Sequence, residues 1–125
     1  MKNYVTVGGH KRLLFLTERV VFDAAEKYGS IQDWGQVIGP DTAEASAALK
    51  WMLVQMVNNG ELERRRRGYE EWPMISESDL PENMTVRQYQ AMRRKVMAEI
   101  TASFSTEIEE DEDIDLGLAE LNEKK

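Results

Sequence analysis

Residues 41–57 form an apolar segment between two sets of helix-boundary signals, and this segment constrains the fold more than any other. Gly39-Pro40 interrupts the chain before it, Asp41 or Thr42 can cap its start, and Asn58-Asn59-Gly60 is the expected end. Its apolar residues fall on more than one side of a helix: Ala45, Ala48, Leu49, Met52, Leu53 and Met56, with Trp51 and Val54 on a second side. A helix of this kind belongs at the centre of a core or in an interface.

The N-terminal residues predict a β-hairpin. Residues 4–7 (YVTV) and 12–16 (RLLFL) are rich in β-prone side chains and flank the sequence Gly8-Gly9-His10-Lys11. A hairpin is only marginally stable alone in water, so we expect it to pack on the helices that follow.

Further helices are expected on both sides of the central one. Thr17 is a suitable N-cap for a helix of residues 17–28 that stops at Gly29, and residues 30–35 predict a short helix. Residues 68–84, with two prolines, predict an extended connection.

The last main helix is predicted to begin at a capping box. Thr85 and Gln88 have the required spacing, and the helix should run to about Phe104. Its expected buried stripe consists of six residues: Val86, Tyr89, Met92, Val96, Ile100 and Phe104.

Charge divides the chain into two parts. Residues 1–104 carry fourteen basic and fourteen acidic residues, whereas residues 105–125 carry nine acids and two lysines, which accounts for the net charge of -7. We therefore predict a mainly α fold: one small helical domain with an N-terminal hairpin over residues 1–104, and a disordered acidic tail over 105–125. A short hydrophobic motif closes the tail, at Ile114, Leu116, Leu118 and Leu121.

Composition restricts the possible functions. The chain has no cysteine, which excludes disulfides, thiolate metal sites and cysteine nucleophiles. No apolar run approaches the roughly 20 residues of a membrane span, and the N-terminus lacks the features of a signal peptide. We expect a soluble cytoplasmic protein that does not contact membranes.

No group of residues predicts catalysis, a cofactor or a metal site. Asp111, Asp113 and Asp115 match the first half of a calcium loop, but Leu116 and Asn122 occupy the positions that need Gly and Glu. His10 is the only histidine, in the expected turn, without partners for a zinc site or a catalytic triad. The chain is not expected to be an enzyme.

The run Arg64, Arg65, Arg66 and Arg67 stands among Glu61, Glu63, Glu70 and Glu71. Because this charge is compensated locally, the run does not favour nucleic acid as a partner. The favoured interpretation is a solvated helical end, either an extension of the central helix or a new turn, whose arginines pair with Glu61 and Glu63. The alternative is contact with an acidic partner or with the chain's own tail.

One alternative for the whole function is a DNA-binding transcription regulator. Residues 30–75 can be interpreted as a winged helix, with residues 41–57 as recognition helix and "NGELERRRR" resembling the entry to a wing. However, a helix that enters the groove needs exposed polar side chains, and residues 41–57 have Lys50 as their only basic residue.

The order of segments along the chain resembles the small tail assembly chaperones of long-tailed phages and prophages, especially those of Gram-positive hosts. "AAEKYGSI" (24–31) resembles the first helix and glycine turn of that family, "LKWMLVQMVNNG" (49–60) its central helix, and "DIDLGLAEL" (113–121) its short closing helix. The run Arg64–Arg67 is not part of the resemblance.

The resemblance implies a non-enzymatic protein of the bacterial cytoplasm. Its partner would be the tape measure protein, a long and partly apolar helical polypeptide that must stay soluble until tail-tube subunits surround it. Self-association is also implied. Flexible methionines suit adaptable binding surfaces. The hypothesis assigns client binding to a surface of five residues: Trp51, Met52, Met56, Tyr89 and Met92.

Overall fold

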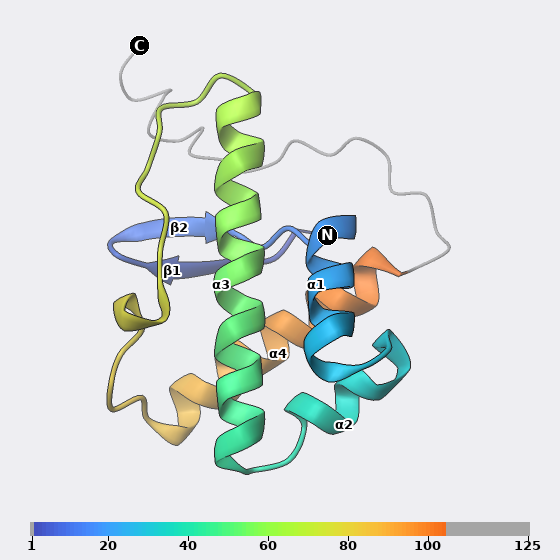
Figure 1. The fold of residues 1–125 in the computed structure, drawn as a ribbon. Helices are drawn as coiled ribbons and strands as arrows, with labels where there is room; N and C mark the ends of the chain where they lie inside the picture. The colour runs from blue at the N-terminus through green and yellow to red at the C-terminus, as the bar shows by residue number, and fades with distance from the viewer. Residues whose placement is uncertain (1, 105–125) are drawn as a thin grey trace.

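The computed structural model describes residues 2–104, which form four α-helices and one β-hairpin (Figure 1). The elements follow in the order β1 (Tyr4–Val7), β2 (His10–Leu13), α1 (Glu18–Tyr28), a 3-10 turn (Ile31–Asp33), α2 (Trp34–Ile38), α3 (Ala43–Arg66), a second 3-10 turn (Glu77–Asp79) and α4 (Val86–Ser103). The mainly α class with an N-terminal hairpin is confirmed. The predicted acidic tail and its terminal motif lie outside the described residues.

Helix α3 is the central element, as the sequence predicts. It packs against β2, α1, α2 and α4, and Figure 1 shows these elements around it. Thr42 caps its start by accepting a hydrogen bond from the N–H of Ala45 at 3.1 Å. Leu49, Met52 and Met56 are at most 1% exposed. Burial on several sides is why this helix can carry apolar residues around most of its circumference.

The end of α3 differs from the main expectation, because the helix continues past Gly60 to Arg66. Gly60 has another role. A Cβ atom at this position would stand 2.0 Å from the carbonyl oxygen of Leu13, so the missing side chain lets β2 approach the helix. The N–H of Phe15 also donates to the carbonyl of Met56 at 3.1 Å, which fastens the end of the hairpin to the helix.

The predicted hairpin is confirmed, with a second strand that begins earlier than expected. Val7 pairs with His10 across a turn formed by Gly8 and Gly9, whose φ angles are 61° and 80°. Turns of two residues with positive φ match the twist of a hairpin, which explains the two glycines. His10 therefore belongs to β2 and not to the turn.

Helix α1 has the predicted boundaries. The side chain of Thr17 accepts a hydrogen bond from the N–H of Val20, and Gly29 ends the helix with a φ angle of 90°. The following short helix runs to Ile38, beyond the expected end at Gly35. Trp34 anchors it, because its indole N–H donates to the carbonyl of Gly29 at 3.0 Å.

Helix α4 begins at the predicted capping box, in which Thr85 and Gln88 each hydrogen-bond the other's backbone N–H. Met92 and Val96 are buried as expected, but Val86 is 72% exposed and Phe104 is 49% exposed. The prediction that the two end residues of the stripe are buried is therefore wrong.

Candidate functional site

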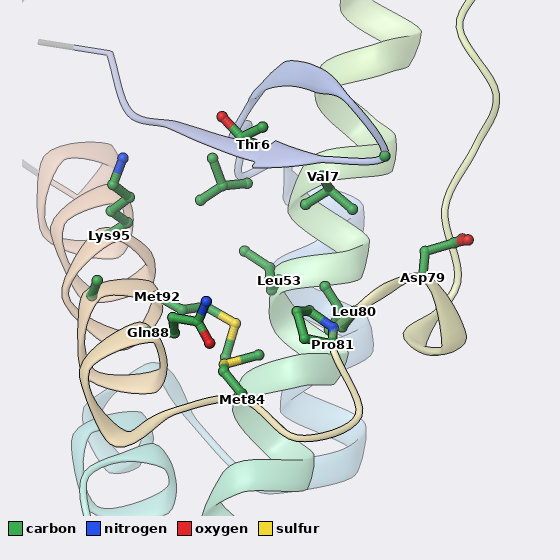
Figure 2. Close-up of a pocket in the computed structure, with 13 residues that line it drawn as sticks. Thr6, Val7, Leu53, Asp79, Leu80, Pro81, Met84, Gln88, Met92 and Lys95 are labelled. Atoms are coloured by element: carbon green, nitrogen blue, oxygen red, sulfur yellow. The ribbon is translucent and has the colours of Figure 1, made fainter.

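An apolar groove of about 350 Å³ lies between the hairpin and α4 (Figure 2). Its walls come from three parts of the chain: residues 5–8 of the hairpin, residues 79–84 of the connection and one face of α4 between Gln88 and Lys95. Leu53 of α3 contributes to the floor. The groove thus exists only in the folded chain. We call it the hairpin–α4 groove.

The floor of the hairpin–α4 groove is apolar. Leu53, Leu80 and Met92 are 1%, 8% and 7% exposed, and Met84 is partly buried beside them. Figure 2 shows the side chains of Met84 and Met92 next to each other. Two thioethers can adapt their shape to different apolar side chains, which suits a surface that binds rather than reacts.

One wall of the groove is the outer edge of β1. Val7 and His10 flank a turn of two residues and are therefore a hydrogen-bonded pair, so the N–H and C=O of Thr6 point away from β2. The carbonyl of Tyr4, which has the same orientation, accepts a hydrogen bond from Lys95 Nζ of α4 at 2.6 Å. This edge therefore faces α4, and the groove offers main-chain groups beside its apolar floor.

The structure places the five predicted partner-binding residues in different environments. Met52 and Met56 are 1% and 0% exposed, so neither side chain reaches the surface on which the prediction placed it. They fill the core because α1, α2 and the hairpin enclose α3. Trp51 is partly buried, and its ring forms a T-shaped pair with the ring of Tyr28, at 5.7 Å between centroids.

Tyr89 and Met92 complete that set. Tyr89 is partly buried, and its hydroxyl has no hydrogen-bond partner within residues 2–104. Met92 alone of the five lines the hairpin–α4 groove. Sequence reasoning missed Met84, although it directly precedes the N-cap Thr85, a position whose apolar side chain often packs against the first turn of a helix.

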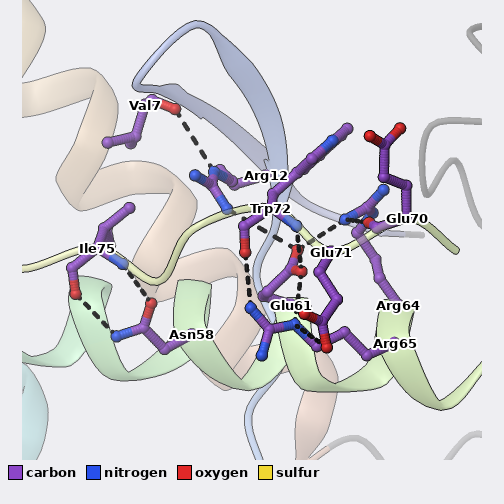
Figure 3. Close-up of polar contacts among 10 residues, drawn as sticks. All are labelled: Val7, Arg12, Asn58, Glu61, Arg64, Arg65, Glu70, Glu71, Trp72 and Ile75. Atoms are coloured by element: carbon purple, nitrogen blue, oxygen red, sulfur yellow. Dashed lines mark hydrogen bonds and ion pairs between the residues drawn. The ribbon is translucent and has the colours of Figure 1, made fainter.

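The arginine run belongs to a buried polar cluster centred on Glu61, which is 1% exposed (Figure 3). Glu61 accepts hydrogen bonds from Arg64 at 2.7 Å, from Arg65 at 2.9 Å and from the N–H of Trp72 at 2.8 Å. Burial by itself would raise the pKa of Glu61, but these hydrogen bonds outweigh it and lower the pKa below its usual value. The carboxylate therefore stays charged inside the protein.

The cluster fastens an extended segment to α3; we call this segment, residues 69–76, the strap. Arg65 donates to the carbonyl of Trp72 at 2.7 Å, and Arg64 donates to the carbonyl of Glu70 at 3.0 Å. Further along, the Asn58 amide both donates to and accepts from the backbone of Ile75, each at 2.9 Å. Side chains of one helix thus hydrogen-bond backbone groups at three positions of the strap (Figure 3).

Trp72 covers the cluster. The Cζ atom of Arg64 is 3.4 Å from the centroid of its ring, and the ring of His10 stacks on it at 4.1 Å. A guanidinium over an indole ring is a favourable cation–π contact. His10 therefore has a structural role in this protein, different from the exposed turn residue expected from the sequence.

These contacts correct part of the prediction for the arginines. Their pairing with Glu61 and Glu63 is confirmed, since Arg66 and Arg67 bind Glu63 at 2.6 and 3.1 Å. The prediction of a solvated segment is wrong for Arg64, because its side chain is 4% exposed and cannot reach an external acidic partner. The side chains of Arg66 and Arg67 are 70% and 38% exposed.

The winged-helix arrangement of residues 30–75 is wrong. "NGELERRRR" continues α3 as a helix, and within residues 2–104 the strands are β1 and β2, both before α1. The remainder of the expected strand and wing, up to residue 75, falls mainly in the strap, which is fixed along α3.

No group of three or more His, Asp or Glu side chains within residues 2–104 is placed to hold a metal ion. Asp111, Asp113 and Asp115 lie outside the described residues. In the same part of the chain, no helix has the length and apolar character needed to cross a membrane.

Comparison of the chain with protein-family models, with curated proteins and with solved structures finds no match.

Proposed function

We propose that this protein is a non-enzymatic chaperone of phage tail assembly that binds apolar segments of a tape measure protein in the bacterial cytoplasm. The client is the one that the sequence resemblance implies. The observation that carries the binding role is the hairpin–α4 groove, which combines an apolar floor with the adaptable side chains of Met84 and Met92. This groove replaces Met52 and Met56 as the proposed client site.

The dimensions of the groove define what it can take. Its volume of about 350 Å³ is at the lower end of the range of roughly 300–1,000 Å³ found for small-molecule pockets. It can accept several apolar side chains from one face of an amphipathic segment and leave the rest of that segment in water. Lys95 and Asp79 at its border would contact the polar side of the client.

The test uses two alanines of α4 that lie two helical turns apart. Ala91 lines the groove and Ala98 is exposed outside it. Each is replaced by glutamate in the full chain and co-expressed with the tape measure protein of the same genome. Ala91→Glu should abolish co-purification and leave the client insoluble, because the carboxylate would be desolvated on the apolar floor. Ala98→Glu should behave as the unmodified protein.

Circular dichroism and thermal unfolding of both variants establish that they are folded. Unchanged client binding by folded Ala91→Glu would exclude the groove as the client site. Failure of the unmodified protein to retain the tape measure protein would exclude the proposed function itself.

A further inference from the structure

We propose that the hairpin–α4 groove also binds the chain's own residues Ile114–Leu118, which would add a third strand to the outer edge of β1. Two described features carry this inference: the strand edge that faces the groove, and the charge of α4 beside it. The groove is the client site of the proposed function, so the inference deepens that proposal by adding regulation.

The sequence IDLGL at 114–118 fits the edge of a sheet. Ile114, Leu116 and Leu118 recur with a period of two, so in an extended conformation they lie on one face. Beside β1 that face can point the same way as Val5 and Val7, toward Leu53 and Met92. The backbone of the segment would pair with the N–H and C=O of Thr6, a mode of recognition in which an extended peptide extends a sheet.

The charge of α4 favours this occupant over an uncharged apolar peptide. Between Val86 and Ala98 the helix carries Arg87, Arg93, Arg94 and Lys95 and no acidic residue. Residues 105–113 carry six Asp or Glu side chains and no basic one. A tail that returns along α4 would therefore place opposite charges side by side, which steers the segment to the groove.

The length of the chain permits this path. Phe104 follows Lys95 by nine residues of helix, about 14 Å at 1.5 Å per residue. Residues 105–113 can span about 30 Å when extended. The linker therefore reaches the groove with slack, and the same molecule can supply both the groove and its occupant.

A spin label on the tail measures this contact in the full chain. Because the chain has no cysteine, Asn122→Cys creates a single attachment point next to the docked segment. Paramagnetic broadening is recorded on the amide of Thr6 and on the methyl groups of Met84 and Met92, with the reduced label as the diamagnetic control. We expect strong broadening at all three, and we expect it to weaken at high salt, where the charges are screened.

Two tail variants distinguish a strand from a helix. In a strand Leu116 points into the groove with Ile114 and Leu118, whereas in a helix Ile114, Leu118 and Leu121 share a face and Leu116 does not. Leu116→Asp should return the groove signals to the diamagnetic level, and Leu121→Asp should leave them broadened. The reverse result would overturn the added strand, and absence of broadening in the unsubstituted tail would overturn docking altogether.

A mixed sample identifies which molecule supplies the tail. Spin-labelled chain without isotopes is added to isotope-labelled chain without the spin label. Broadening in this mixture would show that the tail binds a second copy and would overturn docking within one molecule.

The broadening measurement does not require the tape measure protein, so tail docking and client binding are tested separately. If the tail occupies the groove, Leu116→Asp should also raise the affinity for the tape measure protein several-fold by removing a competitor. Groove broadening without any client binding would support tail docking and exclude the chaperone function. Client binding without broadening would support the chaperone function and exclude tail docking.

Discussion

The two parts of α3 are buried to a similar extent by different chemistry. Residues 43–57 are enclosed by apolar contacts, with Leu49 and Met56 both at 0% exposure. Within residues 58–66 the buried charged side chains are held by hydrogen bonds and ion pairs, with Glu61 at 1% and Arg64 at 3% exposure. The burial of an apolar side chain depends on how well it fills the available space and not on the direction of its contacts. Each buried charge, in contrast, depends on particular partners. The two parts should therefore respond differently to substitution.

Removal of the central carboxylate is the strongest way to test that difference. Glu61→Leu leaves Arg64 buried without its counter-charge, and we expect a loss of about 3–5 kcal/mol in the free energy of unfolding. Met52→Leu, at an equally buried position in the apolar part, should cost less than about 1.5 kcal/mol. Urea unfolding of both variants measures the contrast. Similar losses of unfolding free energy at the two positions would mean that the Glu61 cluster tolerates substitution as well as the apolar core does.

The close approach of α3 to the hairpin at Gly60 gives the next largest effect. In Gly60→Ala the new Cβ would meet the carbonyl oxygen of Leu13, a main-chain atom that can move only with β2. We expect a loss at the upper end of the roughly 1–3 kcal/mol typical of overpacking. Gly35→Ala in α2 is the control, since nothing lies within 4 Å of its added Cβ. That change should stabilise by about 0.5–1 kcal/mol through helix propensity. Equal effects at both glycines would contradict the close packing at Gly60.

The positions predicted correctly from the sequence depend on local signals. Thr17 and Thr85 cap the helices they were expected to cap, and Thr42 is the one of the two candidates, Asp41 and Thr42, that caps α3. These signals are local because a cap involves residues only three positions apart. The end of α3 could not be predicted in this way. Gly60 resembles a helix stop in sequence, but its role is set by contact with Leu13, 47 residues earlier.

The residues of the candidate site could also be predicted only in part from local signals. Met92 was expected to bind a partner and lines the groove, while Met52 and Met56 have the same chemistry and fill the core. Spacing on a helix identifies an apolar face, but it does not tell which element covers that face. The outer edge of β1 is visible only when the hairpin is placed against α4.

Acid should weaken the polar part of α3 selectively. Hydrogen bonds from Arg66, together with those from Arg67, lower the pKa of Glu63 despite its burial, and the pKa of Glu61 is also lowered. Both carboxyls then have lower pKa values when folded than the value of about 4.3 of an unfolded glutamate. Their contribution to stability is present above pH of about 4.3 and is lost as pH falls through the folded pKa values.

The effect of acid should be smaller than that of Glu61→Leu, because a protonated carboxyl still keeps some of its hydrogen bonds. Urea unfolding at several pH values between 7 and 3 measures it. Glu61→Gln has no titrating group at this position, so the profile should become less steep and keep the contribution of Glu63. A free energy of unfolding that stays constant from pH 5 to pH 3 would contradict the lowered pKa values.

Arg12 should have the smallest effect, although it is 3% exposed and carries a full charge. Its Nη1 lies 3.8 Å from Glu61 and has no hydrogen-bond partner within residues 2–104, and its Nε reaches the carbonyl of Val7 only at 3.5 Å. Burial lowers the pKa of Arg12, so the protein holds this charge at a cost. Glu61 keeps Arg64, Arg65 and the N–H of Trp72 without it.

Arg12→Met keeps an unbranched apolar chain and removes the charge, so we expect the free energy of unfolding to change by less than about 1 kcal/mol or to rise. Arg64→Met removes both the shortest ion pair to Glu61 and the contact with Trp72, and it should cost several times more. Parallel urea titrations compare the two. If both variants lose the same stability, the cluster responds to its total charge and not to the geometry of each pair. The contrast between the two parts of α3 would then be one of polarity alone.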